Sequence, residues 1–113
     1  MRHKKKKRIG KGKDHSRKLL RTMAASAIVY EHIETTDKRA KLTKQFVERL
    51  ITKAKKGDLH NNRQIFSALP TNAAKKVIEV LGPKYIDRKG GYMRIVRVGK
   101  YKDGMPKVQL QLV

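Results

Sequence analysis

Positive charge is the feature that most constrains this chain. Of its 113 residues, 30 are Lys or Arg and nine are Asp or Glu, which gives a formal net charge of +21. Self-repulsion of this size opposes a compact fold unless an acidic partner lies close by. We therefore expect the protein to bind a polyanion, for which RNA, DNA and an anionic membrane are the candidates.

The distribution of apolar residues favours nucleic acid over a membrane. No apolar run approaches the roughly 20 residues that cross a bilayer, and no apolar segment follows the basic start MRHKKKKR as in a secretory signal. The apolar residues fall in stripes suited to a core, whereas membrane-surface helices expose bulky apolar side chains. We expect a cytoplasmic protein that is not a homo-oligomer and has no membrane partner and no small-molecule substrate.

The first 13 residues differ in composition from the rest. They contain no acid and one bulky apolar side chain, Ile9. Their eight cations are Arg2, Lys4, Lys5, Lys6, Lys7, Arg8, Lys11 and Lys13. We expect residues 1–13 to form a basic extension that is disordered alone and becomes ordered against RNA phosphates; the alternative is a solvated tail. Residues 14–113 suit one globular domain.

Apolar residues recur at helical spacing from residue 14 to residue 81. Four helices are predicted, beginning near residues 14, 37, 58 and 71. Their predicted N-caps are Asp14 or Ser16, Thr36 or Asp37, Asp58, and Thr71. The last three are predicted to end at Gly57, Pro70 and Gly82-Pro83.

The remaining segments have the composition of strands. Residues 32–36 and 92–98 are rich in β-branched side chains, and residues 107–112 alternate apolar with polar. Asp103-Gly104 is a hairpin-turn signal between the last two. These patterns predict an α+β fold in which about four helices pack on a small three-stranded sheet with a C-terminal hairpin.

The apolar stripes also predict which side chains form the core. The residues expected to be most buried are Leu50, Ile51, Val77, Ile78, Leu110 and Leu112. On the third predicted helix, Leu59, Ile65, Phe66 and Leu69 are expected to be buried as well.

Residue types that could carry catalysis are scarce. The chain has no Cys, its four His residues lie at no helical ligand spacing, and no Asp-x-Asp or Glu-x-Glu pair is present. The segment Gly10-Lys11-Gly12-Lys13 lacks the spacing of a phosphate-binding loop of nucleotide hydrolases. We therefore expect no catalytic residue, no metal site and no cofactor.

The segment from Lys84 to Arg94 places four cations and two aromatic rings around Gly90-Gly91. Glycine allows positive φ, and without a Cβ its backbone amide can approach a phosphate closely. We predict that one of the two glycines has positive φ or lies against RNA backbone. The alternative, which the residue types favour equally, is a flexible segment that leads into the strand starting at Tyr92.

Several known modes of nucleic-acid recognition do not fit the sequence. Only Tyr92 supplies an aromatic ring to a predicted strand, so no base-stacking sheet is expected, and no helix-turn-helix accompanies the basic extension. Recognition of shape and phosphate by distributed Lys and Arg remains. A DNA-packaging protein and a small nuclease are the alternatives to an RNA-binding protein.

Short segments that run in order along nearly the whole chain narrow this choice. They are Met1-Arg2-His3, His15, Leu20-Arg21, Met23-Ala24, Ile33-Glu34-Thr35-Thr36, Ala40-Lys41, Glu48-Arg49-Leu50-Ile51-Thr52, Ala54-Lys55, Leu81-Gly82-Pro83-Lys84-Tyr85, Arg88, Gly90-Gly91-Tyr92-Met93-Arg94-Ile95 and Leu110-Gln111-Leu112-Val113. Together they resemble the bacterial large-subunit ribosomal protein seventeen family.

The resemblance implies an α/β body with a small mixed sheet, bound to large-subunit (23S) rRNA near the nascent-chain exit region. It also implies contact with the neighbouring large-subunit protein thirty-two. With the basic composition, it predicts a non-catalytic protein whose cations reduce repulsion between phosphates of separate RNA segments. The candidate rRNA-binding residues are Arg2, His3, Lys4, Lys5, Lys6, Lys7, Arg8, Lys11, Lys13, His15, Arg17, Lys18, Arg21, Arg88, Lys89, Gly90, Gly91 and Arg94.

The extension gives the first testable prediction. Changing Lys4, Lys5, Lys6 and Lys7 to Gln keeps its length and removes four charges. For each phosphate that is no longer neutralised, the slope of log affinity against log salt should become shallower by about 0.7–0.9. We expect a shallower slope for rRNA fragments and an unchanged melting temperature; equal slopes for the two proteins would mean that these lysines do not contact RNA.

Overall fold

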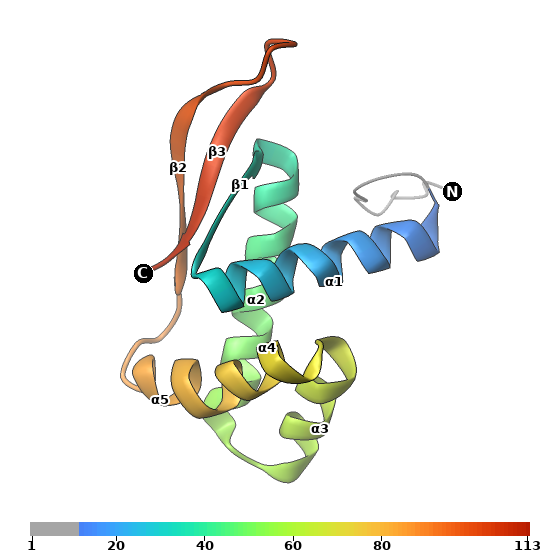
Figure 1. Cartoon of the computed structure of the whole chain (residues 1–113). Helices are drawn as coiled ribbons and strands as arrows, with labels where there is room; N and C mark the ends of the chain where they lie inside the picture. The colour runs from blue at the N-terminus through green and yellow to red at the C-terminus, as the bar shows by residue number, and fades with distance from the viewer. Residues whose placement is uncertain (1–11) are drawn as a thin grey trace, which may run out of the picture.

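The protein is described here from a computed structural model that covers residues 12–113, and the predicted contacts of residues 1–11 lie outside this range. Along the chain, the elements are α1 (Lys13–Tyr30), β1 (His32–Thr36), α2 (Asp37–Lys56), α3 (Leu59–Ala68), α4 (Thr71–Lys76), a π-helical turn η1 (Val77–Leu81), α5 (Gly82–Lys84), β2 (Met93–Lys100) and β3 (Pro106–Leu112). The predicted α+β class is confirmed (Figure 1).

Helix α2 is the central element of the fold. It contacts α1, α3, η1, α5 and all three strands. The sheet lies toward its N-terminal end and the short helices lie toward its C-terminal end (Figure 1). Its buried residues are Ala40, Thr43, Val47, Leu50, Ile51 and Ala54. This spacing of three, four and seven residues places them on one helix face, as the sequence predicted for Leu50 and Ile51.

The sheet is antiparallel throughout, so the mixed sheet implied by the family resemblance is wrong. The strand order is β1-β3-β2, with Ile33 paired to Leu110 and Ile95 paired to the same residue from the other side. Glu31, in the left-handed conformation at φ 68°, ends α1 just before β1 begins. The predicted hairpin joins β2 to β3, and Gly104 in its turn has φ 87°.

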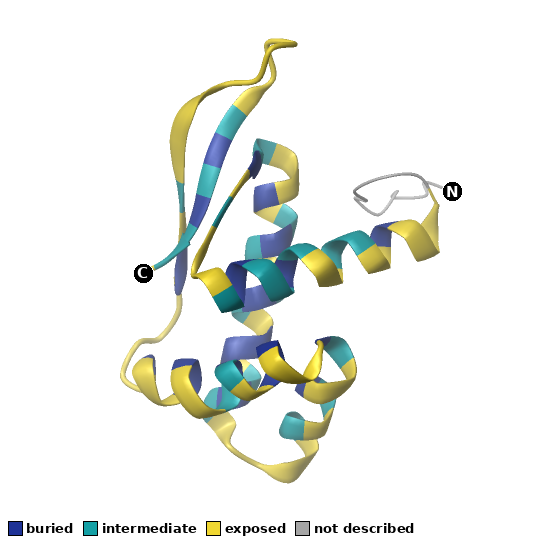
Figure 2. Cartoon of the chain, in the orientation of Figure 1, coloured by how far each residue is buried: buried dark blue, intermediate teal, exposed yellow. Residues whose placement is uncertain are grey.

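Four of the six side chains predicted to be most buried are confirmed. Leu50 is 3% exposed, and Ile51, Val77 and Leu110 are fully buried. Ile78 and Leu112 are partly buried and pack against the same core. The stripes therefore identify the inward faces correctly, while the margins of each face depend on which neighbour covers them (Figure 2).

The predicted burial of Leu59 and Phe66 is wrong. Leu59 is 65% exposed and Phe66 is 44% exposed, although Ile65 and Leu69 of the same segment are buried. Helix α3 has only ten residues and contacts α2 and α4 on one side, so a single apolar face is covered. Asp58 caps α3 as predicted. The hydrogen bond that its carboxylate accepts from the backbone N–H of Asn61 lowers the pKa of Asp58.

The fourth helix does not end at Gly82-Pro83 as predicted. The α4 helix widens into the π-helical turn η1, where the N–H of Gly82 bonds to the carbonyl of Val77, and α5 continues to Lys84. A proline clashes with the carbonyl four residues before it in a regular α-helix, and the wider turn relieves that restriction. A Cβ on Gly82 would lie 3.4 Å from the Cβ of Ala54, so glycine allows close packing on α2.

The predicted N-caps of two helices, α1 and α4, are wrong. The α1 helix begins after Gly12, and the Ser16 hydroxyl donates back to the Gly12 carbonyl at 2.8 Å instead of capping the helix. Thr71 lies inside α4, where Pro70 takes the N-cap position. Thr36 occupies the predicted N-cap position of α2, but its side chain makes no capping hydrogen bond.

The burial pattern predicts the effect of truncating Leu50. Replacement by Ala should lower the free energy of unfolding by about 2–5 kcal/mol because it leaves a cavity between α2 and its neighbours. Leu59→Ala, the matched control at an exposed position, should change it by less than about 0.5 kcal/mol. Equal melting temperatures for the two variants would contradict the observed orientation of α2.

Gly91 provides a second stability prediction. It has φ +64°, whereas Gly90 does not lie in the left-handed region, and a Cβ on either residue would meet open space. Gly91→Ala should therefore lower the free energy of unfolding by about 1–2 kcal/mol through backbone strain alone, and Gly90→Ala should not. A chemical denaturation series of the two variants checks this, and an equal loss for both would contradict it.

Candidate nucleic-acid interface

Most cations of the described chain have no acidic partner. Residues 12–113 contain 23 of the 30 Lys and Arg residues and all nine acids. The ion pairs within this range are Lys41–Asp37 at 2.9 Å, Lys76–Glu31 at 3.2 Å and Lys107–Glu34 at 3.0 Å. The fold therefore does not neutralise its own charge, and a large positive surface remains available to an external anion.

The first group of predicted contact residues lies on α1. Lys13, His15, Arg17, Lys18 and Arg21 are all exposed. Ser16 is the only buried residue of α1 before Ala24. The N-terminal half of this helix therefore extends away from the core (Figures 1 and 2). Lys13, Arg17 and Arg21 follow one another at four-residue spacing along one face, an arrangement suited to contact with a phosphate backbone.

The second group lies in the loop between α5 and β2. We call residues 86–91 the glycine loop; in it, Arg88, Lys89, Gly90 and Gly91 are exposed. The positive φ of Gly91 confirms the prediction for this pair. Among the described residues, the backbone N–H groups of both glycines have no hydrogen-bond partner, while Arg88 Nε donates to both carbonyls at 3.1 and 3.2 Å. Unpaired, exposed N–H groups are suited to a phosphate oxygen.

The glycine loop is held in place by α2. The N–H of Tyr92 donates to Glu48 Oε2 at 2.9 Å, and Lys55 Nζ donates to Tyr92 Oη at 2.8 Å and to the carbonyl of Arg88. The rings of Tyr85 and Tyr92 lie 5.2 Å apart and are almost fully buried. Tyr92 is therefore an anchor for the loop, which rules it out as a surface on which a base could stack.

A shallow depression lies between the glycine loop and α2. Its volume is about 460 Å³, and Arg49, Lys53 and Lys56 of α2 line it together with Gly90. We call it the basic depression. The carboxylate of Glu48, which also lines it, already accepts the Tyr92 N–H. Three cations and the unpaired N–H group of Gly90 therefore border a space in which a backbone phosphate could lie.

The three α2 cations were not among the residues predicted to bind RNA. Their signal is present in the sequence, because positions 49, 53 and 56 fall on one face of the predicted helix 37–56. What the sequence lacks is the position of the glycine loop beside that face. Conversely, Arg94 was grouped with the loop, but it lies on β2, where its Nε donates to Gln111 Oε1 at 2.9 Å.

The structure thus separates the predicted contact residues into two surfaces. The N-terminal half of α1 and the glycine loop lie on opposite sides of the molecule (Figure 1).

Within residues 12–113, no group of three His, Asp or Glu side chains could hold a metal ion. None of the helices in this range combines the length and apolar character required to cross a bilayer.

Comparison with known proteins identifies the family of this chain. Residues 19–113 match the family model described as ribosomal protein L17. A large ribosomal subunit protein bL17 of Desulforudis audaxviator is 44% identical over 95% of this chain and 97% of its own length. The bL17 proteins of Thermodesulfovibrio yellowstonii and Syntrophotalea carbinolica are 42% and 40% identical over 93% and 100% of this chain, and over 80% and 75% of their own lengths. On these matches, the chain belongs to the ribosomal protein L17 family.

Proposed function

We propose that this protein is a structural component of the large ribosomal subunit and binds rRNA through its phosphates. Family membership supports the place in the large subunit, and therefore in the bacterial cytoplasm, since the relatives are bacterial large-subunit proteins. The basic depression is the observation that carries the RNA-binding proposal. It combines three cations that form no ion pair within residues 12–113 with the unpaired backbone N–H group of Gly90, in a loop that hydrogen bonds attach to α2.

The proposed mechanism is electrostatic. A phosphate in the basic depression would receive hydrogen bonds from the N–H groups of Gly90 or Gly91 and charge from Arg49 and Lys53. Because the glycine loop is already anchored by Glu48 and Lys55, little ordering entropy is lost when the phosphate binds. Binding should therefore retain most of the free energy gained from the release of condensed counterions.

Two basic surfaces on opposite sides give the protein a structural role that one surface could not. The glycine loop and the extended half of α1 can each bind a different RNA segment (Figure 1). Neutralising both segments lowers their mutual repulsion and allows them to approach. From the family resemblance, we further propose that the RNA is 23S rRNA near the nascent-chain exit region, and that large-subunit protein thirty-two is a neighbour.

The basic depression predicts a specific change in salt dependence. Changing Arg49, Lys53 and Lys56 to Gln should make the slope of log affinity against log salt shallower by about 2–3 for an rRNA fragment in duplex form. All three side chains lie on the outer face of α2, so we expect the melting temperature to be unchanged within a few degrees. Filter binding over a range of salt concentrations measures the slope.

A matched variant removes the same charge elsewhere. The control changes Arg63, Lys44 and Lys75 to Gln, which also removes one Arg and two Lys. All three lie outside the basic depression. We expect this control to change the slope less than the depression variant does. If both variants change it equally, the binding depends on net charge alone and the basic depression is not a site.

A further inference from the structure

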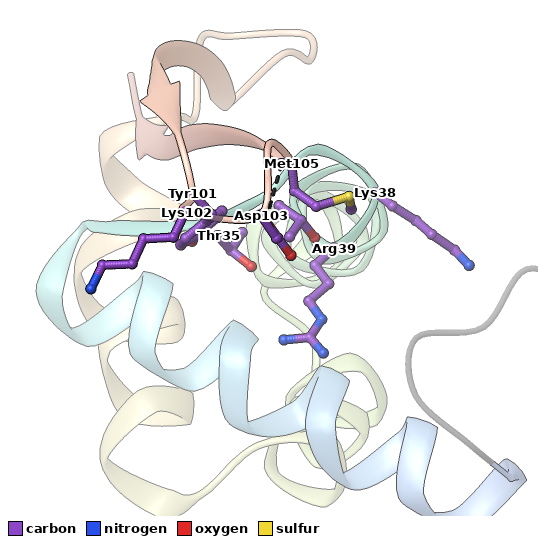
Figure 3. A pocket seen from close by; sticks show the side chains of 8 residues that line it. Thr35, Lys38, Arg39, Tyr101, Lys102, Asp103 and Met105 are labelled. Carbon is purple, nitrogen blue, oxygen red and sulfur yellow. Dashed lines mark hydrogen bonds between the residues drawn. The ribbon is translucent and has the colours of Figure 1, made fainter.

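A second hollow differs in chemistry from the basic depression. It has a volume of about 900 Å³ and lies between the tip of the β2–β3 hairpin, the end of β1 and the first turn of α2. We call it the hairpin pocket (Figure 3). Thr35, Arg39, Tyr101 and Met105 are among the residues that line it. Its volume falls within the roughly 300–1,000 Å³ of pockets that hold small ligands.

The hairpin pocket exposes an aromatic ring and a thioether in an otherwise polar region. Tyr101 is 37% exposed and Met105 is 48% exposed. The two side chains line the same concave surface, so a ligand in the hairpin pocket would contact both. The ring of Tyr101 is therefore accessible for stacking, in contrast to the buried rings of Tyr85 and Tyr92.

Cations surround these apolar walls. Lys38, Arg39 and Lys102 line the hairpin pocket, and they form none of the ion pairs present within residues 12–113. In Figure 3, Lys102 and Lys38 extend in opposite directions with Arg39 between them. The one carboxylate in the lining, Asp103, accepts the N–H of Met105 at 3.1 Å. The rim is consequently positive.

The hairpin tip is held in one conformation by its own hydrogen bonds. The N–H of Tyr101 donates to the carbonyl of Met105 at 2.9 Å, and the N–H of Gly104 donates to the carbonyl of Tyr101 at the same distance. Lys107 Nζ lies 5.6 Å from the centroid of the Tyr101 ring, which a cation–π interaction stabilises. A preformed pocket loses little conformational entropy when a ligand binds.

We propose that the hairpin pocket holds an unstacked base of single-stranded RNA. The base would lie against Tyr101 and Met105, and the flanking phosphates would contact Lys38, Arg39 or Lys102. Aromatic side chains bordered by cations are the usual receptors for splayed-out bases. An apolar protein segment would match the walls but would leave the three cations without partners, so the charges favour RNA.

This proposal rests on the proposed RNA-binding function and adds a single-stranded segment to it. The test uses the full chain and two probes, a twelve-nucleotide single-stranded oligoadenylate and a twelve-base-pair RNA duplex. Tyr101→Leu should weaken binding of the oligoadenylate about tenfold, the order expected when one stacking interaction is removed. Binding of the duplex should change less than twofold, and Tyr101→Phe should retain the original affinity for both probes.

Tyr30→Leu is the matched control, because Tyr30 is 69% exposed on α1 and lies outside the hairpin pocket. We expect it to leave oligoadenylate binding unchanged. Equal losses for the two Leu variants, or no loss for Tyr101→Leu in a protein with an unchanged melting temperature, would overturn the proposal. If Tyr101→Leu unfolds the protein, Lys38→Gln with Arg39→Gln replaces it and should likewise weaken oligoadenylate binding more than a matched pair of changes at Arg63 and Lys75.

The remaining outcomes separate this proposal from the function on which it rests. If the duplex binds at the basic depression and Tyr101→Leu has no effect on oligoadenylate binding, only the proposal for the hairpin pocket is overturned. If the unaltered protein binds neither probe, both proposals are overturned. In assembled large subunits, ultraviolet cross-linking should yield a nucleotide adduct on Tyr101, and a peptide adduct in its place would assign the pocket to a protein.

Discussion

Burial of one face of α2 is the interaction on which the rest of this structure depends. Val47, Leu50 and Ile51 lie at the centre of the core, and three helices, the π-helical turn and all three strands contact the same helix. Because 35% of the residues are charged, few apolar side chains are available to form a core. Concentrating them around one helix provides a single core large enough to oppose the chain entropy and the self-repulsion.

The same helix links the core to the candidate interface. While its buried face holds the sheet and the short helices, Glu48 and Lys55 anchor the glycine loop, and Arg49, Lys53 and Lys56 line the basic depression beside it. Glu48, the one acid that lines the basic depression, is engaged with the backbone N–H of Tyr92. The surface charge therefore remains available for phosphates while the scaffold stays rigid.

Several local features follow from the sequence because they depend on near neighbours in the chain. The left-handed cap at Gly57, the side-chain cap at Asp58 and the hairpin turn at Asp103-Gly104 all lie where their residue types predict. The prediction fails where the neighbour is distant. Leu59 and Phe66 belong to an apolar stripe, but no element within residues 12–113 covers their side of α3. Pro83 continues a helix that follows a π-helical turn.

The sequence by itself determined the α+β class and the inward face of α2, and it predicted positive φ at Gly90 or Gly91 as one of two alternatives, because periodicity and missing side chains act locally. Only the tertiary structure decided which cations act together. It placed Gly90 beside Lys53, paired Arg94 with Gln111 of the neighbouring strand, and brought Tyr101 of the hairpin and Arg39 of α2 to one pocket. These neighbours are set by how helices and strands pack around α2, and the pattern along one segment contains no information on that packing.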